Sequence, residues 1–363
     1  MLKKAIESVF IIVSTIVGFG VFLLPYALQI SGGYFWIWFI VVALAVYELH
    51  LAYGELLFDA KEKHNLPGLI SQRLGKHWKL PVWIFDYVGI LLVLLLFLVA
   101  LSQFVPLVLP VSALTVKAFF ALLFVLVGLL SVNPFANIKT VFSIAMIFLF
   151  AILSGLLFPY VRPENLVWQN SQYFFSYGLL VFAFIGYSSL QMVYDLIGPN
   201  AALFRRVNKA ALMIVSALYL FFTASVVGVL GNTTAENSLV QLVTIFGPAI
   251  GSLSIALAMV SMSSVAFSLV FYIKRGLMVD FKIKEFPAWY AIAVPLILFV
   301  FIPLQGVVQL ADLIGGLFLS VNILLLLVAY DHIKHKKYFH IHPILLRALI
   351  LLFAIGWVVS LAL

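Results

Sequence analysis

The sequence predicts an all-α polytopic membrane protein with about eleven transmembrane helices, and three observations support this. Of the 363 residues, 65% are hydrophobic and only 9% are charged, whereas about a quarter of a soluble domain is charged. The apolar residues form runs long enough to cross about 30 Å of hydrocarbon, which takes about 20 residues of helix. The basic residues lie in short segments between these runs. No polar segment is long enough for a separate soluble domain, so we expect one transmembrane domain over residues 1–363.

Eleven apolar runs follow one another along the chain. The first run is too long for the core of a signal peptide and contains Pro25, which favours a membrane helix over a cleaved leader. Between the second and third runs, segment 59–81 has apolar residues at roughly helical spacing. This segment fits either a short amphipathic helix on the inner membrane surface or a solvated loop. The expected spans are 6–29, 34–57, 83–104, 115–132, 138–159, 173–196, 208–230, 247–273, 288–303, 306–329 and 343–362.

The basic residues predict the orientation of the chain. If the N-terminus is cytoplasmic, 19 of the 21 Lys and Arg residues lie in inner segments, and only Lys117 and Arg162 lie outside. An error in the number of spans would reverse every later loop and remove this asymmetry. We therefore expect a protein of a prokaryotic cell (inner) membrane with a cytoplasmic N-terminus and an external C-terminus. The net charge of +8 is spread over short loops without a continuous basic face, so we expect no nucleic-acid partner.

Two spans are interrupted near their middles. The first span carries Gly18, Gly20 and Pro25, and the sixth carries Gly186 within segment 182–189. Glycines alone also suit close helix packing, but irregular backbone at mid-membrane survives only where it lines a protein cavity. Each interrupted span opens a group of five helices, and the two groups have opposite orientations. Corresponding breaks in two inverted halves predict a substrate site at the membrane midplane.

Such breaks expose backbone groups that suit a zwitterion. The second half of the first span begins near Gly18 with unpaired N–H groups and a positive dipole end, which favour a carboxylate. Carbonyl groups released around 14–17 and 184–185 can accept hydrogen bonds from an ammonium group or bind a cation. Gly18 and Gly20 would let the ligand approach the backbone closely.

The segment 18–25, Gly-Phe-Gly-Val-Phe-Leu-Leu-Pro, resembles the first-helix signature of the amino acid–polyamine–organocation superfamily. Continued to Gly32 and Gly33, it looks most like the amino acid/auxin permease family, including bacterial tryptophan/tyrosine permeases. Segment 182–187 is similar to the same family, although members often have His where Tyr187 stands. The resemblance extends over nearly the whole chain in helix number and loop pattern. It implies a LeuT-type fold of two inverted five-helix repeats (about 5–160 and 173–330) with an additional helix (343–362), and cation-coupled amino acid transport by alternating access.

The resemblance also implies roles for individual residues. Gly18, Phe19 and Gly20 would donate N–H groups to the substrate carboxylate, while residues 184–186 would line its amine and side-chain end. The substrate site implied in this way comprises Val17, Gly18, Phe19, Gly20, Phe184, Ile185, Gly186 and Tyr187.

A coupling site is implied beside the first break. Ser263 and Ser264 resemble the hydroxyl pair that holds sodium in sodium-coupled relatives, together with carbonyl groups near Val13 and Ile16. These serines equally suit helix packing or bonds to their own backbone. In some proton-driven relatives a lysine inside the fifth helix takes the place of sodium. Because Lys139 lies at the cytoplasmic start of the expected fifth span, we do not expect that arrangement here. The coupling ion is left open between H⁺ and Na⁺, and no cofactor or metal site is expected.

Ionisable residues inside membrane helices are costly and therefore suggest function. Glu48, His50 and Asp312 lie deepest, which fits either proton coupling or structural pairing, and Glu48 is the candidate proton carrier. Asp195 lies within reach of the basic loop 205–206, which suggests a cytoplasmic latch. Two acids closer to the inner interface suggest a solvated or paired structural role: Glu55 and Asp86.

These features predict a secondary active transporter for amino acids, and the resemblance suggests aromatic ones. The alternative is a membrane amino-acid sensor that uses the same pocket, similar to a germinant-receptor subunit. We expect no enzyme, because the sequence has no HExxH, GxSxG or phosphate-binding glycine motif. The histidines at 332–342 suit incidental clustering in a charged loop better than a metal site. The expected partners are a small amino acid and the lipid bilayer, and the oligomeric state is left open.

Overall fold

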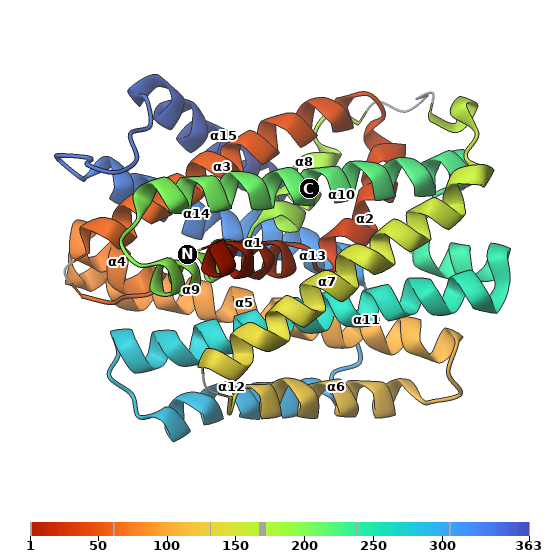
Figure 1. The fold of residues 1–363 in the computed structure, drawn as a ribbon, viewed down its shortest axis with the longest axis horizontal. Helices are drawn as coiled ribbons and strands as arrows, with labels where there is room; N and C mark the ends of the chain where they lie inside the picture. The colour runs from red at the N-terminus through yellow and green to blue at the C-terminus, as the bar shows by residue number, and fades with distance from the viewer. Residues whose placement is uncertain are drawn as a thin grey trace.

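The computed structural model describes residues 2–60, 62–130, 132–166, 172–236, 238–304 and 306–362. Within these ranges the secondary structure is helical, without strands, and all eleven predicted runs form helices. Seven helices are long and apolar enough to cross a membrane, one bent pair passes the same test together, and three apolar helices are shorter. Most of the helices lie along the long axis of the molecule (Figure 1).

The first half of the chain contains two helices that share one span and a short helix between spans. The first span consists of α1 and α2. Segment 59–81 contains the short helix α4, which is neither a solvated loop nor a helix on the surface. Residues Leu66, Leu69 and Ile70 of α4 are buried because the helix packs against α5, α11 and α14. The helices are α1 (Leu2–Ile16), α2 (Gly20–Ser31), α3 (Tyr34–Asp59), α4 (Leu66–Leu74), α5 (Lys79–Phe104), α6 (Ala113–Val127) and α7 (Val132–Leu157).

The second half contains three spans with irregular backbone. The sixth span is divided between α8 and α9, and α11 bends at Gly247, whose φ of 72° is left-handed. The tenth span contains a π-helical turn, Ile314–Leu319, between α13 and α14. The helices are α8 (Phe175–Phe184), α9 (Leu190–Ile197), α10 (Ala201–Leu230), α11 (Ser238–Asp280), α12 (Glu285–Phe299), α13 (Val307–Leu313), α14 (Ser320–Asp331) and α15 (Pro343–Ala362).

The bent first span lies at the centre of the bundle. In Figure 1, α1 is surrounded by other helices, while α6 and α12 form one edge and α15 lies at the opposite edge. The last turns of α1 are buried, and α1 packs against α7, α10 and α11. Because neighbouring helices surround α1 and α2, the irregular backbone between them is kept away from lipid, as the membrane interior requires.

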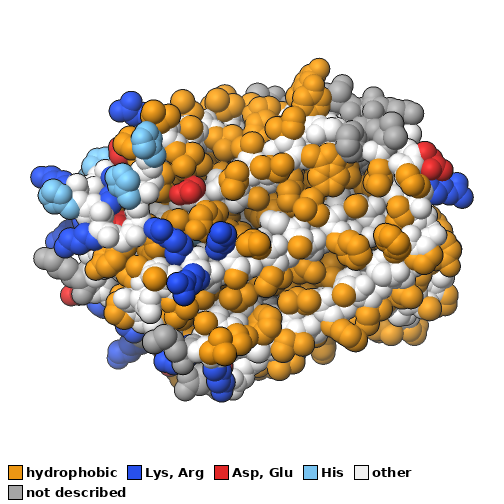
Figure 2. Space-filling view, turned by 45° about the horizontal axis from the view of Figure 1, so that its top comes forward, with side chains coloured by type: hydrophobic (Ala, Val, Ile, Leu, Met, Phe, Trp, Pro, Cys, Tyr) orange, Lys and Arg blue, Asp and Glu red, His pale blue; other side chains and the backbone are white. Residues whose placement is uncertain are grey.

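The surface separates charged from apolar side chains. Figure 2 shows Lys, Arg and His side chains gathered at one end of the molecule, next to a broad hydrophobic region. This distribution is typical of a membrane protein whose apolar belt faces lipid.

Candidate functional site

Both predicted helix breaks are present. α1 ends at Ile16 and α2 begins at Gly20, with a bend of 57° between them. α8 ends at Phe184, and after Ile185 and Gly186 the chain continues through a 3₁₀ turn, Tyr187–Ser189, into α9. The two helices are therefore interrupted at the positions that the sequence predicted.

The two breaks pack directly against each other. A Cβ atom on Gly20 would lie 2.6 Å from the Cα atom of Ala183, and a Cβ atom on Gly186 would lie 2.3 Å from Cγ1 of Ile16. Neither position has room for a larger side chain. Tyr219 of α10 joins the breaks, because its hydroxyl donates hydrogen bonds to the carbonyl oxygens of Ile16 (3.1 Å) and Ala183 (2.7 Å).

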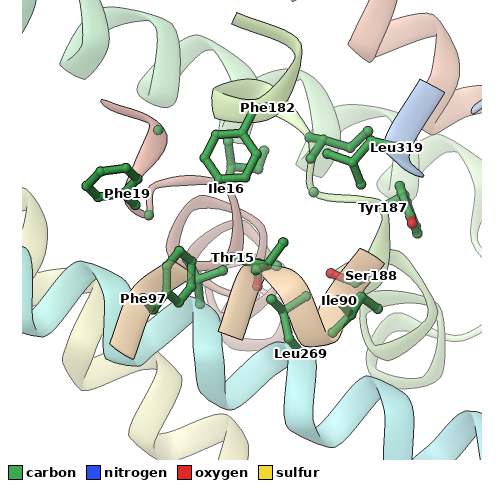
Figure 3. A pocket seen from close by; sticks show the side chains of 16 residues that line it. Thr15, Ile16, Phe19, Ile90, Phe97, Phe182, Tyr187, Ser188, Leu269 and Leu319 are labelled. Carbon is green, nitrogen blue, oxygen red and sulfur yellow. The ribbon is translucent and has the colours of Figure 1, made fainter. Parts of the chain in front are cut away.

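A cavity of about 50 Å³ adjoins both breaks (Figure 3). Its walls are largely apolar and come from α5, α11 and the π-helical turn as well as from the two broken spans. π-Helical turns are frequent at functional sites, and Leu319 of this turn faces the cavity. The lining residues outside the two breaks are Ile90, Val93, Phe97, Val265, Leu269 and Leu319.

Most of the predicted substrate-site residues lie around this cavity. Val17 and Phe184 do not line it: both are fully buried, and Phe184 packs against Phe39 and Tyr219. Sequence reasoning missed the walls contributed by α5, α11 and the π-helical turn, because apolar residues in a membrane helix give no signal of which face meets a cavity. The predicted residues that line the cavity are Gly18, Phe19, Gly20, Ile185, Gly186 and Tyr187.

The start of α2 leaves backbone donors free. The N–H groups of Gly18, Phe19 and Gly20 have no hydrogen-bond acceptor among the described residues. All three residues line the cavity, and the positive end of the α2 dipole adds to the attraction for an anion. The cavity therefore combines free backbone N–H groups with largely apolar walls.

Lys139 does not lie at the start of its helix, and the expectation that placed it there was wrong. Because α7 begins at Val132, Lys139 is seven residues further along, about 10 Å into the helix at 1.5 Å per residue. Its side chain is fully buried. The ammonium group donates to the carbonyl oxygens of Ser14 (2.8 Å) and Ser264 (2.8 Å) and to Oγ of Ser264 (3.0 Å). Lys139 thus connects α1, α7 and α11.

The other residues of the predicted coupling site have different partners. The carbonyl oxygen of Val13 accepts the N–H of Val17 at 2.9 Å, and that of Ile16 accepts the Tyr219 hydroxyl. Ser263 is buried on α11 next to Ser264. Among the predicted coupling residues, Ser264 is the one whose oxygens bind the lysine ammonium group.

The hydroxyl of Tyr187 contacts a buried carboxylate, that of Asp86. The hydroxyl groups of Tyr187 and Tyr272 donate to the two oxygens of Asp86 at 2.7 and 2.8 Å, and Nδ2 of Asn322 donates to Oδ1 at 3.3 Å. Asp86 is 4% exposed. Of the two roles predicted for it, the paired structural role is therefore the one that the structure supports. Four elements meet at this carboxylate: α5, the 3₁₀ turn, α11 and α14.

Glu48 and His50 do not line the cavity. Glu48 is half-buried on α3. Nδ1 of His50 is 3.0 Å from Oδ1 of Asn208 on α10. The side chain of Asp312 falls outside the described part of the chain. Glu48 is not among the residues that line this cavity, and its role as a proton carrier stays a prediction.

Glu55 has a structural role near the C-terminal end of α3. It is fully buried, and its carboxylate accepts the backbone N–H groups of Lys337 (2.6 Å), Tyr338 (3.0 Å) and Phe339 (2.6 Å). These bonds hold the loop between α14 and α15 against α3. The histidines of this loop form no metal-binding group with other His, Asp or Glu residues in the described ranges.

Asp195 forms ion pairs, but not with the partners predicted for a latch. Instead of Arg205 or Arg206, the carboxylate pairs with Arg275 of α11 and with Lys63, whose Nζ is 3.3 Å from Oδ1. The prediction of partners was wrong because nearness along the chain does not determine which helix ends meet. The latch joins α9, α11 and the segment before α4.

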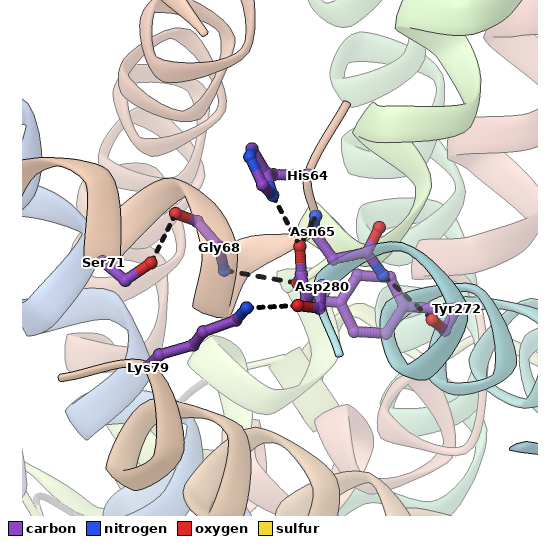
Figure 4. A network of polar contacts seen from close by, with 7 residues as sticks. All are labelled: His64, Asn65, Gly68, Ser71, Lys79, Tyr272 and Asp280. Carbon is purple, nitrogen blue, oxygen red and sulfur yellow. Dashed lines mark hydrogen bonds and ion pairs between the residues drawn. The ribbon is translucent and has the colours of Figure 1, made fainter. Parts of the chain in front are cut away.

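A second cluster, centred on Asp280, closes the same region (Figure 4). Its carboxylate accepts the N–H groups of Asn65 (3.3 Å) and Gly68 (3.2 Å) and contacts Nδ1 of His64 at 2.9 Å. The ammonium group of Lys79 donates to the Asp280 carbonyl oxygen. A small cavity lined by Asn65, Asp86 and other residues lies between this cluster and the Asp86 carboxylate. The basic end of the molecule is thus tied together beneath the larger cavity.

Comparisons with known proteins agree with this architecture. The model of the tryptophan/tyrosine permease family matches residues 1–272. The chain is similar to the structure described as the crystal structure of MhsT in complex with L-phenylalanine, with a TM-score of 0.74, 12% identity, and coverage of 98% of this chain and 97% of that one. No curated protein matches the sequence. The fold is therefore of the LeuT type, as predicted. The chain belongs to the tryptophan/tyrosine permease family, and it is an integral membrane transporter of amino acids rather than an enzyme.

Proposed function

We propose that this protein is a secondary active transporter that moves an amino acid with a large apolar or aromatic side chain by alternating access. The observation that carries the proposal is the set of free N–H groups at Gly18, Phe19 and Gly20 beside an apolar cavity. The family match supports an amino acid, and the similar MhsT structure is one with L-phenylalanine. We also propose that the family lies in the amino acid/auxin permease branch of the amino acid–polyamine–organocation superfamily, on the residues of the first break.

In this proposal, the three parts of the substrate bind at three different places in the site. The carboxylate binds at the start of α2, where unpaired N–H groups and the helix dipole act together. The ammonium group binds carbonyl oxygens that the breaks release, such as that of Ile185, which accepts no hydrogen bond from the described residues. The side chain extends along the apolar walls formed by α5, α11 and Leu319.

We propose that protons, rather than sodium ions, drive transport, and that Lys139 is the coupling group. Its ammonium group binds Ser14 and Ser264 oxygens of α1 and α11, which are the kind of ligands a sodium ion would need. The lysine ammonium group therefore takes the place that a sodium ion would need. Loss of its proton would remove the charge that attracts these oxygens, and α1 would then separate from α11 more easily.

Alternating access requires one side of the cavity to close while the other opens. The ion pairs of Asp195 and the cluster around Asp280 tie the basic end together, which supports a conformation closed toward that side. We propose that this end faces the cytoplasm of a cell membrane, with the N-terminus inside and the C-terminus outside, because basic residues are retained there.

The coupling proposal is tested by replacing Lys139 with methionine, which keeps a long unbranched side chain and removes its charge. In proteoliposomes, we expect Lys139→Met to abolish uptake of L-phenylalanine driven by a proton gradient. Lys117→Met is the matched control, because Lys117 donates to the carbonyl oxygen of Ile302 and neither residue lines the cavity. We expect the control to retain uptake.

Two outcomes would contradict the proposal. Uptake that requires a sodium gradient in the unmodified protein would exclude proton coupling. A protein that binds amino acids but carries none under either gradient would be the predicted sensor instead of a transporter.

A further inference from the structure

Three polar side chains line the cavity among the described residues: those of Thr15, Tyr187 and Ser188. Two of them are already used within the protein. Oγ1 of Thr15 bonds the carbonyl oxygen of Ile11 at 2.7 Å and Oγ of Ser268 at 2.9 Å. The Tyr187 hydroxyl donates to Asp86 at 2.7 Å. A substrate would have to displace these contacts in order to use either group.

Ser188 is different. Its side chain is half-buried, and its hydroxyl has no hydrogen-bond partner in the part of the chain that the structure describes. In Figure 3, Ser188 lies near Ile90 and Leu269, on the opposite side of the cavity from Phe19. Because no described group of the protein occupies this hydroxyl, a ligand that enters the cavity can bond to it without displacing an internal contact.

The charged ends of the substrate do not need this hydroxyl. The backbone donors at Gly18, Phe19 and Gly20 suit the carboxylate, and the released carbonyl groups suit the ammonium group. Phe19 and Ser188 lie across the cavity from each other (Figure 3), so the remaining part of a bound amino acid that extends toward Ser188 is its side chain.

We propose that the Ser188 hydroxyl hydrogen-bonds a polar atom on the aromatic ring of the substrate, and that it sets the preference among aromatic amino acids. A serine hydroxyl both donates and accepts hydrogen bonds, so one residue can serve the phenol of tyrosine and the indole N–H of tryptophan. Phenylalanine offers no such atom and leaves the hydroxyl unpaired. This inference rests on the proposed function, because it assigns the selectivity of the same cavity.

Ser188→Ala tests the inference, and the chain supplies a matched control. Ser189 is the next residue, and its hydroxyl donates to the carbonyl oxygen of Gly186 at 2.8 Å without lining the cavity. Competition uptake is measured in proteoliposomes with L-tyrosine, L-tryptophan and L-phenylalanine. Because one hydrogen bond is worth about 1.4 kcal/mol, or about tenfold, we expect Ser188→Ala to lower the tyrosine/phenylalanine and tryptophan/phenylalanine ratios about tenfold. Ser189→Ala should leave both ratios unchanged.

A second measurement uses the unmodified protein and does not depend on the folding of a variant. 1-Methyl-L-tryptophan lacks the indole proton, so we expect it to compete with uptake about tenfold less well than L-tryptophan in the unmodified protein. In Ser188→Ala the two compounds should compete equally, because the hydroxyl that distinguishes them is absent.

The outcomes separate this inference from the proposed function. If the unmodified protein transports none of the three amino acids, the proposed function fails. If it transports them and Ser188→Ala leaves the ratios unchanged, the assignment of Ser188 is wrong. An equal loss for all three amino acids would also overturn it, because the hydroxyl would then serve a group that they share.

Discussion

Gly20 and Gly186 lie at the two points where the broken spans cross. The backbone of Ala183 and the side chain of Ile16 occupy the space that a Cβ atom would need. These glycines therefore do more than interrupt helices: they let two irregular segments approach closely enough to share the Tyr219 hydroxyl. Their conformational freedom is secondary, because neither has a positive φ.

We expect Gly20→Ala to destabilise the protein, since its methyl group would meet backbone atoms of α8 that cannot move independently. Overpacking of this kind costs about 1–3 kcal/mol. Thermal unfolding in detergent measures the effect. Gly155→Ala in α7 is the control, because a Cβ atom there meets nothing within 4 Å. Equal melting temperatures for the two variants would mean that the breaks are not in contact.

The sixth span shows how a broken element is held in place. The 3₁₀ turn that follows Gly186 is fixed by Tyr187, whose hydroxyl reaches the buried carboxylate of Asp86 on α5. Tyr272 of α11 and Asn322 of α14 donate to the same carboxylate. A carboxylate that accepts bonds from three other elements fixes their relative positions, because each lost donor leaves a buried acceptor unpaired.

We expect Tyr187→Phe to lower stability by about 1–3 kcal/mol, the cost of a hydrogen bond to a buried charged group. The melting temperature in detergent is again the measurement. Tyr290→Phe serves as the control, because Tyr290 is 55% exposed on α12 and is not one of the donors to this carboxylate. A Tyr187→Phe variant as stable as the control would show that Asp86 does not depend on this donor.

At the scale of the whole molecule, one end of the bundle is closed by contacts between elements distant in sequence. Asp195 of α9 pairs with Lys63 and Arg275, and Asp280 of α11 binds the start of α4. The small cavity beneath Asp86 lies inside this closure. Opening of the transporter toward that side would have to break these contacts together.

We expect Asp195→Asn to favour the open state about fivefold, since a partly buried ion pair of about 1 kcal/mol is lost. The chain has no cysteine, so a single Ile273→Cys substitution reports access to the small cavity, which Ile273 lines. Maleimide labelling should proceed faster in the Asp195→Asn background. Glu62→Gln is the control, because Glu62 is an exposed acid without an ion pair among the described residues. Equal labelling rates in the two backgrounds would contradict this function of the latch.

The sequence by itself determined the all-helical membrane fold, the positions of the spans and the two breaks around Gly18 and Gly186. These properties depend on local chemistry: the length of an apolar run and the effect of glycine on a helix can be read along the chain. The short amphipathic pattern of 59–81 was also visible, although its packing was not. The family motif added the implied substrate site around the breaks.

Only the tertiary structure decided the partners of the charged residues. It placed Lys139 between Ser14 and Ser264, gave Asp86 its two tyrosines and paired Asp195 with Arg275. It also showed that Ser188 is the lining hydroxyl without a partner among the described residues. The reason is physical: whether a polar group is buried, paired or free depends on which faces of distant helices meet, and a one-dimensional pattern does not contain that information.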